Sequence, residues 1–315
     1  MQAKFSSLNF SDLYLGERVA YLSGVPEALD PLPVPLQYKS ELDELRILVS
    51  DSNLGKNEFA IKFGGSGYRV SVLQSINEKV YVLRKFPSVV PDFYSLGFHP
   101  DVISKLMAPG ITGLIIVAGA YSNGKTTTAS ALVKERLSLH GGVGITIEDP
   151  PEMPLEGAHG DGVCWQTEVE QGSFAAEVRS AARWAPSIIF LGEIRDAETA
   201  TEVLRASTNG RLVVCTTHAD NVITAIERIY SLANGVAGTS SDVANMMANG
   251  LYAVIHQKLE GEPKRPRIEF LFLDNESLGA KSMIRNRKFE QLGSEINQQL
   301  NRIIRSGSLL SIASK

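Results

Sequence analysis

The sequence has little cysteine, no long apolar stretch and no strong excess of charge of either sign. Only Cys164 and Cys215 occur among 315 residues, so neither a disulfide framework nor a four-cysteine zinc site is expected. No apolar run approaches the roughly 18 residues of a membrane span, and the N-terminus lacks the core of a signal peptide. A net charge of −4 gives no support to a nucleic-acid-binding groove. We therefore expect a cytoplasmic protein that binds no nucleic acid.

The pattern of apolar residues changes along the chain and indicates two domains. Residues 1–86 are predicted to form a small α+β domain, with helical spacing over 39–50 and a glycine-rich hairpin over 58–73. Residues 87–98 are rich in turn-forming residues and are predicted to be a linker. From residue 99 to residue 315 strands alternate with helices, which predicts an α/β domain with a mostly parallel sheet. Further strands of the first domain are expected at 12–15, 19–22 and 80–85.

The segment from Gly119 to Thr126 fits the pattern Gly-x4-Gly-Lys-Ser/Thr. The apolar run 114–118 before it predicts a buried strand, and residues 126–134 after it predict the start of a helix. This order points backbone N–H groups and the positive end of a helix dipole at one place, which suits a phosphate group. Lys125 would reach the β and γ phosphates of ATP, and the Thr126 hydroxyl would take a Mg²⁺ position. The alternative is a glycine turn with a solvated lysine. The residues predicted to bind the nucleotide are Gly119, Ser122, Asn123, Gly124, Lys125, Thr126 and Thr127.

Polar residues directly follow three further apolar runs, 144–147, 187–191 and 211–217. The carboxyl ends of parallel strands meet at one edge of a sheet, where ligands bind in open α/β folds. Phosphoryl transfer requires charged groups, Mg²⁺ and a positioned water at such a site. Taken singly, the glutamate after the second run could be solvated and the histidine after the third could be a turn residue. The candidate residues at these strand ends are Glu148, Asp149, Glu152, Glu193 and His218.

Three of these strings resemble the sequence boxes of one ATPase family. Residues 147–152, 191–196 and 216–220 resemble the Asp box, the Walker B box and the His box of the secretion-superfamily ATPases. These are the hexameric motors of type IV pili, type II secretion and type IV secretion. The resemblance is closest to the PilT-like branch, which includes pilus-retraction motors and DotB-like motors. Residues 253–259 and 283–286 resemble the C-terminal helices of the family.

The resemblance implies an architecture and a cellular role. It implies an N-terminal PAS-like domain followed by a RecA-like ATPase domain with C-terminal helices, assembled as a homo-hexamer. Such a ring would hydrolyse ATP with Mg²⁺ at the inner face of the bacterial inner membrane and pass motion to a platform protein there. The machine could be a retraction-type pilus or a secretion or conjugation system, and the direction of force stays open.

The resemblance also implies roles for residues in the ATPase domain. Lys125 and Thr126 match the phosphate-loop lysine and hydroxyl. Glu193 matches the Walker B glutamate, which holds Mg²⁺ through water. His218 matches the His-box residue that senses the γ-phosphate.

Further roles follow from the Asp box and from the first domain. Glu152 matches the residue that polarises the attacking water, with Glu148 and Asp149 supporting the metal site. Arg69 and Arg84 match arginines that reach nucleotide across a subunit interface, where a guanidinium neutralises charge on the transferred phosphoryl group. Without the resemblance, both arginines would be interpreted as solvated strand residues.

Two departures from the family pattern affect the predicted site. The phosphate loop has Ala120-Tyr-Ser-Asn123 where the family usually has Pro-Thr-Gly-Ser, and fewer glycines are expected to stiffen it. Ala219 and Asp220 replace the usual Thr-Asn after the histidine.

Two other functions are consistent with a phosphate loop. The first is a RecA-like ring that translocates nucleic acid, which the acidic net charge and the lack of an aromatic and basic stripe disfavour. The second is a nucleotide-binding regulator without turnover. That function would require a missing carboxylate, and none is missing.

Overall fold

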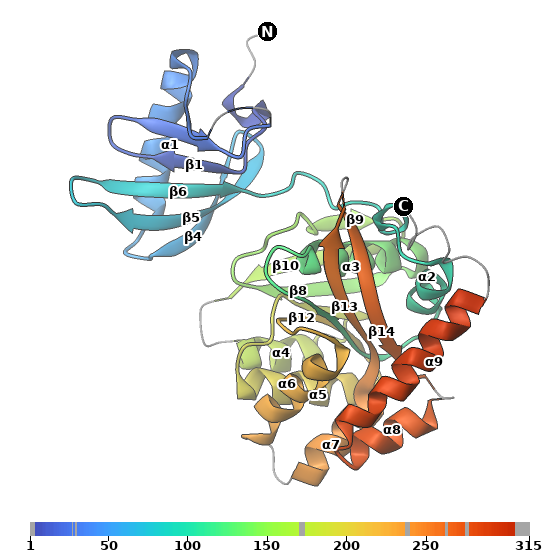
Figure 1. Cartoon of the computed structure of the whole chain (residues 1–315). Helices are drawn as coiled ribbons and strands as arrows, with labels where there is room; N and C mark the ends of the chain where they lie inside the picture. Colours follow the sequence, from blue (N-terminus) through green and yellow to red (C-terminus); the bar gives the residue numbers. More distant parts are fainter. Residues whose placement is uncertain are drawn as a thin grey trace. The chain divides into compact units, whose positions relative to one another are not determined.

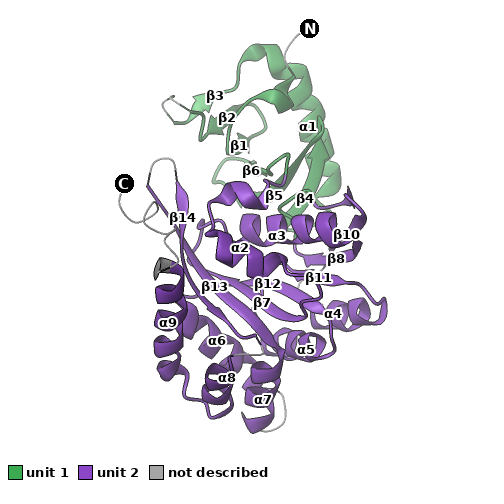
Figure 2. Cartoon of the chain, turned by 90° about the vertical axis from the view of Figure 1, so that its right-hand side faces the viewer, with its two compact units in different colours: residues 1–89, 150–154 green, residues 90–149, 155–315 purple. Residues whose placement is uncertain are grey.

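The computed structural model of the chain describes residues 4–26, 28, 30–169, 174–236, 240–261, 264–274 and 277–305. The chain divides into two compact units, which Figure 2 shows in different colours. The first comprises residues 1–89 and 150–154, and the second comprises residues 90–149 and 155–315. The segment predicted as a linker is divided between them, and it contains the 3₁₀ turn Phe93–Leu96. Both units combine helices with a sheet, so the predicted α/β class is confirmed.

The first unit contains a six-stranded sheet in the order β3-β2-β1-β6-β5-β4, whose neighbouring strands pair antiparallel. Helix α1 (Lys39–Ser52) confirms the helix predicted over 39–50, and its Leu42, Leu45 and Val49 share one buried cluster with residues of the sheet. The strands predicted in this unit are confirmed with shifts of one or two residues at their ends. The strands of this sheet are β1 Asp12–Leu15, β2 Ala20–Ser23, β3 Leu32–Pro33, β4 Glu58–Phe63, β5 Ser66–Gln74 and β6 Lys79–Lys85, of which β3 was not predicted.

The second unit contains an eight-stranded sheet in the order β14-β13-β7-β12-β11-β8-β10-β9 (Figure 1). Strands β13, β7, β12, β11, β8 and β10 run parallel to their neighbours, and β14 and β9 pair antiparallel at the two edges. The carboxyl ends of the parallel strands therefore meet at one edge of the sheet. The bounds are β7 Gly113–Ala118, β8 Gly142–Glu148, β9 Gly157–His159, β10 Gly162–Glu168, β11 Ile188–Leu191, β12 Leu212–Thr217, β13 Leu251–Glu260 and β14 Arg265–Phe272.

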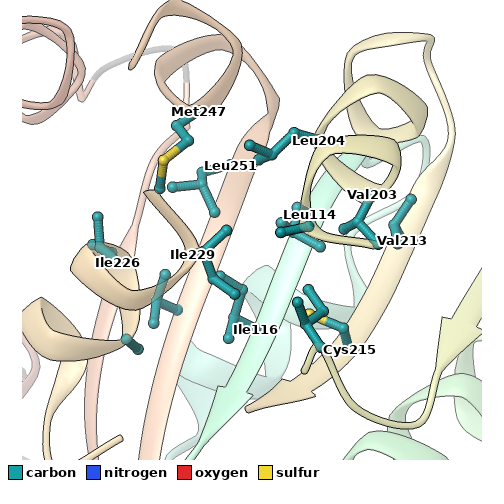
Figure 3. Close-up of a cluster of buried hydrophobic side chains, with 14 of the residues drawn as sticks. Leu114, Ile116, Val203, Leu204, Val213, Cys215, Ile226, Ile229, Met247 and Leu251 are labelled. Atoms are coloured by element: carbon teal, nitrogen blue, oxygen red, sulfur yellow. The ribbon is translucent and has the colours of Figure 1, made fainter. Parts of the chain in front are cut away.

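Helices cover both faces of this sheet, which explains why its strands are continuous apolar runs. Leu114 and Ile116 of β7 face one layer of helices, with Val213 and Cys215 of β12 beside them (Figure 3). Helix α3 lies on the opposite face (Figure 2). Both cysteines are buried and free, in agreement with the absence of a disulfide framework. The helices are α2 Pro100–Met107, α3 Lys125–His140, α4 Phe174–Arg183, α5 Ala197–Thr208, α6 Val222–Asn234, α7 Ser240–Gly250, α8 Leu278–Arg285 and α9 Leu292–Arg305.

The prediction of a C-terminal helix over residues 253–259 is wrong, because these residues lie in strand β13. The strand pairs parallel to β7 and antiparallel to β14, so its backbone hydrogen bonds go to neighbouring strands. Val254 and Ile255 are β-branched and fully buried, which suits a covered strand. The second string, 283–286, lies at the end of α8 as predicted. Within the described part of the chain, no helix combines the length and the apolar character needed to cross a membrane.

Helix α3 offers a matched pair of leucines for testing the packing of the second unit. Leu137 is fully buried against Gly144 of β8, whereas Leu139 is 50% exposed. Leu137→Ala should lower the free energy of unfolding by about 2–5 kcal/mol, because the lost side chain leaves a cavity. Leu139→Ala should change it by less than about 0.5 kcal/mol. Urea denaturation followed by circular dichroism measures both, and equal losses would contradict this packing.

Candidate active site

The predicted site residues of the second unit follow strands whose ends are in register. Ala118, the last residue of β7, pairs with Thr217, the last residue of β12. Leu191, the last residue of β11, pairs with Cys215 of β12 and with Ile147 of β8. The residues that follow these positions leave the sheet at the same edge. The structure therefore brings four predicted residues to this edge: Lys125, Glu148, Glu193 and His218.

The phosphate loop passes so close to β13 that only glycine fits at its first position. A Cβ atom on Gly119, whose φ is +153°, would lie 2.4 Å from the carbonyl oxygen of Gln257. Gly124 has φ +74° and directly precedes α3, and Ser122 also adopts a left-handed conformation, with φ +56°. The N-cap residue of α3 is Gly124, which has no side chain to cap the helix. The positive dipole end of this 16-residue helix lies directly after the glycine loop, an arrangement that suits an anion.

Asn123 connects the phosphate loop to β13 through two hydrogen bonds. Its Oδ1 accepts a hydrogen bond from the backbone N–H of Leu259 at 2.9 Å, and its carbonyl oxygen accepts one from Gln257 Nε2. The Gln257 side chain is almost fully buried beneath the loop. The sequence did not predict this contact, because residues 253–259 were expected to be helical. The one feature of the sequence that pointed to Asn123 was its departure from the serine usual in the family at this position.

Lys125, His218 and Glu193 form a connected row. Lys125 is 9% exposed, and its Nζ donates to the carbonyl oxygen of Ala120 at 2.9 Å. The same Nζ lies 3.4 Å from Nδ1 of His218, and Nε2 of His218 lies 3.5 Å from Oε1 of Glu193. The other carboxylate oxygen of Glu193 accepts a hydrogen bond from Arg195 Nε at 2.9 Å. A cation, an imidazole and a carboxylate thus lie side by side at the strand ends.

The surroundings of His218 disfavour the charged form of its imidazole. Burial and, next, the positive charge of Lys125 lower the pKa of His218, and Arg228 acts in the same direction, whereas Glu193 opposes them. A neutral imidazole that accepts from Lys125 at Nδ1 carries its proton on Nε2, which faces Glu193.

The residues predicted to hold Mg²⁺, which are Thr126, Glu148, Asp149 and Glu193, differ in exposure. Glu148 is buried and accepts a hydrogen bond from Gln166 Nε2 at 3.1 Å, whereas Thr126, Asp149 and Glu193 are partly exposed. Among the described residues no three His, Cys, Asp or Glu side chains converge to hold a metal ion. A Mg²⁺ ion in a phosphate-loop site takes most of its ligands from phosphate oxygens, water and one hydroxyl. The side-chain oxygens of the predicted Mg²⁺ residues fit that arrangement better than a site in which protein side chains supply every ligand.

Three predicted site residues, Arg69, Arg84 and Glu152, belong to the first unit. Arg69 and Arg84 lie directly opposite each other on β5 and β6, where two positive charges repel. Each is paired with a carboxylate: Arg84 Nε donates to Asp12 at 2.8 Å, and Arg69 Nη2 donates to Glu152. The hydrogen bond to Asp12 raises the pKa of Arg84. The sequence indicated neither pairing.

Comparison with known proteins identifies the family. The family model described as "Type II/IV secretion system protein" matches residues 55–287. The chain is 35% identical over 215 residues to uncharacterized protein YggR of Escherichia coli K12, covering 67% of this chain and 63% of that protein. It is 32% identical over 222 residues to type IV pilus ATPase PilU of Pseudomonas aeruginosa, covering 68% and 56%. The chain thus spans less than two thirds of the length of each relative.

Solved structures extend the similarity to the whole fold. The pilus retraction motor PilT with bound ADP superposes with a TM-score of 0.75 at 25% identity, covering 97% of this chain and 94% of that one. The ATPase DotB of Legionella pneumophila shares the fold, with a TM-score of 0.73 at 23% identity over 93% of this chain and 85% of that one. The chain therefore belongs to the type II/IV secretion system protein family, the secretion-superfamily traffic ATPases, and is PilT/DotB-like in fold.

Proposed function

We propose that the chain hydrolyses ATP with Mg²⁺ as a hexameric motor of a retraction-type pilus or of a type IV secretion or conjugation machine. The observation that carries this proposal is the row of Lys125, His218 and Glu193 at the start of α3. Lys125 lies 3.4 Å from His218, and His218 lies 3.5 Å from Glu193. A buried lysine at a helix N-terminus, followed by an imidazole and a carboxylate, provides the charges that phosphoryl transfer requires.

The residues at the strand ends fit ATP and Mg²⁺. Lys125 would exchange the carbonyl oxygen of Ala120 for phosphate oxygens, and the backbone of Gly124 and Thr126 would bind phosphate at the start of α3. The Thr126 hydroxyl and, through water, Glu193 would hold Mg²⁺, which neutralises charge on the phosphates. His218 would respond to the γ-phosphate through its contact with Lys125.

The remaining predicted residues and both domains also have roles in the proposed motor. Residues 1–86 would form a PAS-like domain and residues 99–315 a RecA-like ATPase domain, joined by the linker 87–98. Glu152 would polarise the attacking water, with Glu148 and Asp149 supporting the metal site. Arg69 and Arg84 would serve the nucleotide of a neighbouring subunit.

The cellular setting follows from the family. PilU, whose name places it in the type IV pilus, and the retraction motor PilT support a pilus role for this chain. The ring would act in the cytoplasm on a platform protein of the inner membrane. Translocation of nucleic acid is not favoured, since the net charge of −4 offers little attraction for phosphate backbones.

The phosphate-loop lysine provides the first test. Lys125→Ala should abolish ATP hydrolysis, because phosphate groups would then lack a counter-charge in a poorly hydrated loop. Lys288→Ala, which removes an exposed lysine before a short 3₁₀ turn, is the matched control and should leave turnover unchanged. Phosphate release measures both, and hydrolysis at the wild-type rate by Lys125→Ala would refute the site assignment.

A second test separates the two glutamates. Glu193→Gln should shift the Mg²⁺ dependence of hydrolysis, whereas Glu152→Gln should lower kcat while nucleotide binding persists. Since Glu152 also pairs with Arg69, nucleotide affinity is measured by fluorescent ADP binding to separate a binding defect from a loss of chemistry. If Glu152→Gln turns over at the wild-type rate, Glu148 or Glu193 becomes the better candidate for the base.

A third test concerns the arginines of the first unit. If Arg69 and Arg84 act in a neighbouring subunit, an isolated subunit should be nearly inactive. Mixing inactive Lys125→Ala with inactive Arg69→Ala/Arg84→Ala should restore part of the turnover, because the first chain still supplies its arginines. The loss for one such arginine is about a thousandfold or more, so partial rescue is easily detected.

The control for this mixture is Lys125→Ala combined with a chain that carries all three substitutions, which leaves no intact site. No rescue should be seen there at any ratio. Full activity of an isolated monomer, or failure of the first mixture at every ratio, would remove the trans-arginine model.

A further inference from the structure

Tyr121, in the unusual part of the phosphate loop, stacks on the imidazole of His218. The two ring centroids are 4.9 Å apart, and the ring planes differ by 18°. Tyr121 is 78% exposed, so hydrophobic burial alone does not explain the position of this ring. Tyr121 stands where the family usually has threonine.

The other contacts of His218 hold it weakly. Lys125 Nζ and Glu193 Oε1 lie 3.4 and 3.5 Å from its two ring nitrogens, which is long for hydrogen bonds. A backbone hydrogen bond to Gly119 adds a further attachment, while Arg228 contributes only charge. The Tyr121 ring stacks on the face of the imidazole, and such a contact restricts rotation of the histidine about its side-chain bonds.

Tyr121 also lies next to the phosphate-loop lysine. Lys125 Nζ is 5.9 Å from the centroid of the tyrosine ring, within the range of a cation–π contact. One aromatic ring therefore contacts both the lysine that is predicted to bind phosphate and the histidine that is predicted to sense it. A threonine at this position could do neither.

We propose that Tyr121 is a positioning residue that fixes the imidazole of His218 between Lys125 and Glu193. This inference rests on the proposed ATPase function for its consequence, but the stacking itself is independent of nucleotide. Tyr121 acts through His218: it keeps the imidazole in one position, so that the histidine is already placed when phosphate binds. Because stacking stabilises an aromatic pair, removal of the Tyr121 ring should change the acylation rate of His218 and kcat about two- to tenfold each.

The first experiment needs no nucleotide. Diethyl pyrocarbonate acylates accessible imidazoles, and peptide mass spectrometry gives the rate at His218 relative to His159 in the same sample. Tyr121→Ala should raise this ratio about two- to tenfold, because the imidazole gains freedom and loses its cover. Tyr121→Phe, which keeps the ring, should match the wild type. An unchanged ratio in Tyr121→Ala would overturn the proposal.

The second experiment is a double-mutant cycle on turnover. Tyr121→Ala should lower kcat about two- to tenfold with little change in KM for ATP, and Tyr121→Phe should restore it. In a His218→Ala background, Tyr121→Ala should have no further effect. An equal loss in both backgrounds would show that Tyr121 does not act through His218. If the wild type shows no ATP hydrolysis, the proposed function fails, whereas the acylation experiment still decides on the stacking.

Discussion

The close passage of the phosphate loop over β13 is the constraint on which the rest of the site depends. A side chain on Gly119 would collide with the carbonyl oxygen of Gln257, and Asn123 binds the backbone of Leu259. Since β13 is hydrogen-bonded beside β7, the loop that leaves β7 has a rigid strand along its flank. The start of α3 is thereby held at the strand ends, and Lys125 lies within reach of His218. Loss of this contact would free the helix N-terminus from the sheet edge.

The charges of the second unit are balanced across the same edge. Lys125 is nearly buried, and a second cation beside it would be unfavourable. His218 avoids this because burial and Lys125 lower its pKa, so a neutral ring separates the lysine from Glu193. Phosphate entering the loop would change the electrostatic environment of all three groups at once. The arrangement is suited to detecting an anion.

In the first unit, too, positive charges lie close together, but carboxylates compensate them. Arg69 and Arg84 lie opposite each other on neighbouring strands, and Glu152 and Asp12 each take up one of the positive charges. An arginine that acts on a nucleotide would first have to leave its carboxylate. For Arg69 this partner is Glu152, the residue assigned to the attacking water, so the proposed arginine and base functions are coupled within this chain.

The sequence by itself determined the elements whose signal is local. Buried parallel strands are continuous apolar runs, so β7, β8, β11 and β12 could be predicted, and the glycines and lysine of the phosphate loop identified the start of α3. The order of the polar residues after these strands predicted that they lie at one edge of the sheet, and Lys125, Glu193 and His218 lie together at that edge.

Only the tertiary structure decided the conformation of residues 253–259 and the partners of the site residues. Residues 253–259 were expected to be helical from the family resemblance, and their hydrogen bonding to β7 and β14 makes them part of β13. The contacts of Asn123 with Leu259 and of Tyr121 with His218 join residues far apart in the chain. Side-chain pairing of that kind depends on which strands become neighbours, and no periodicity or motif in a single sequence encodes it locally.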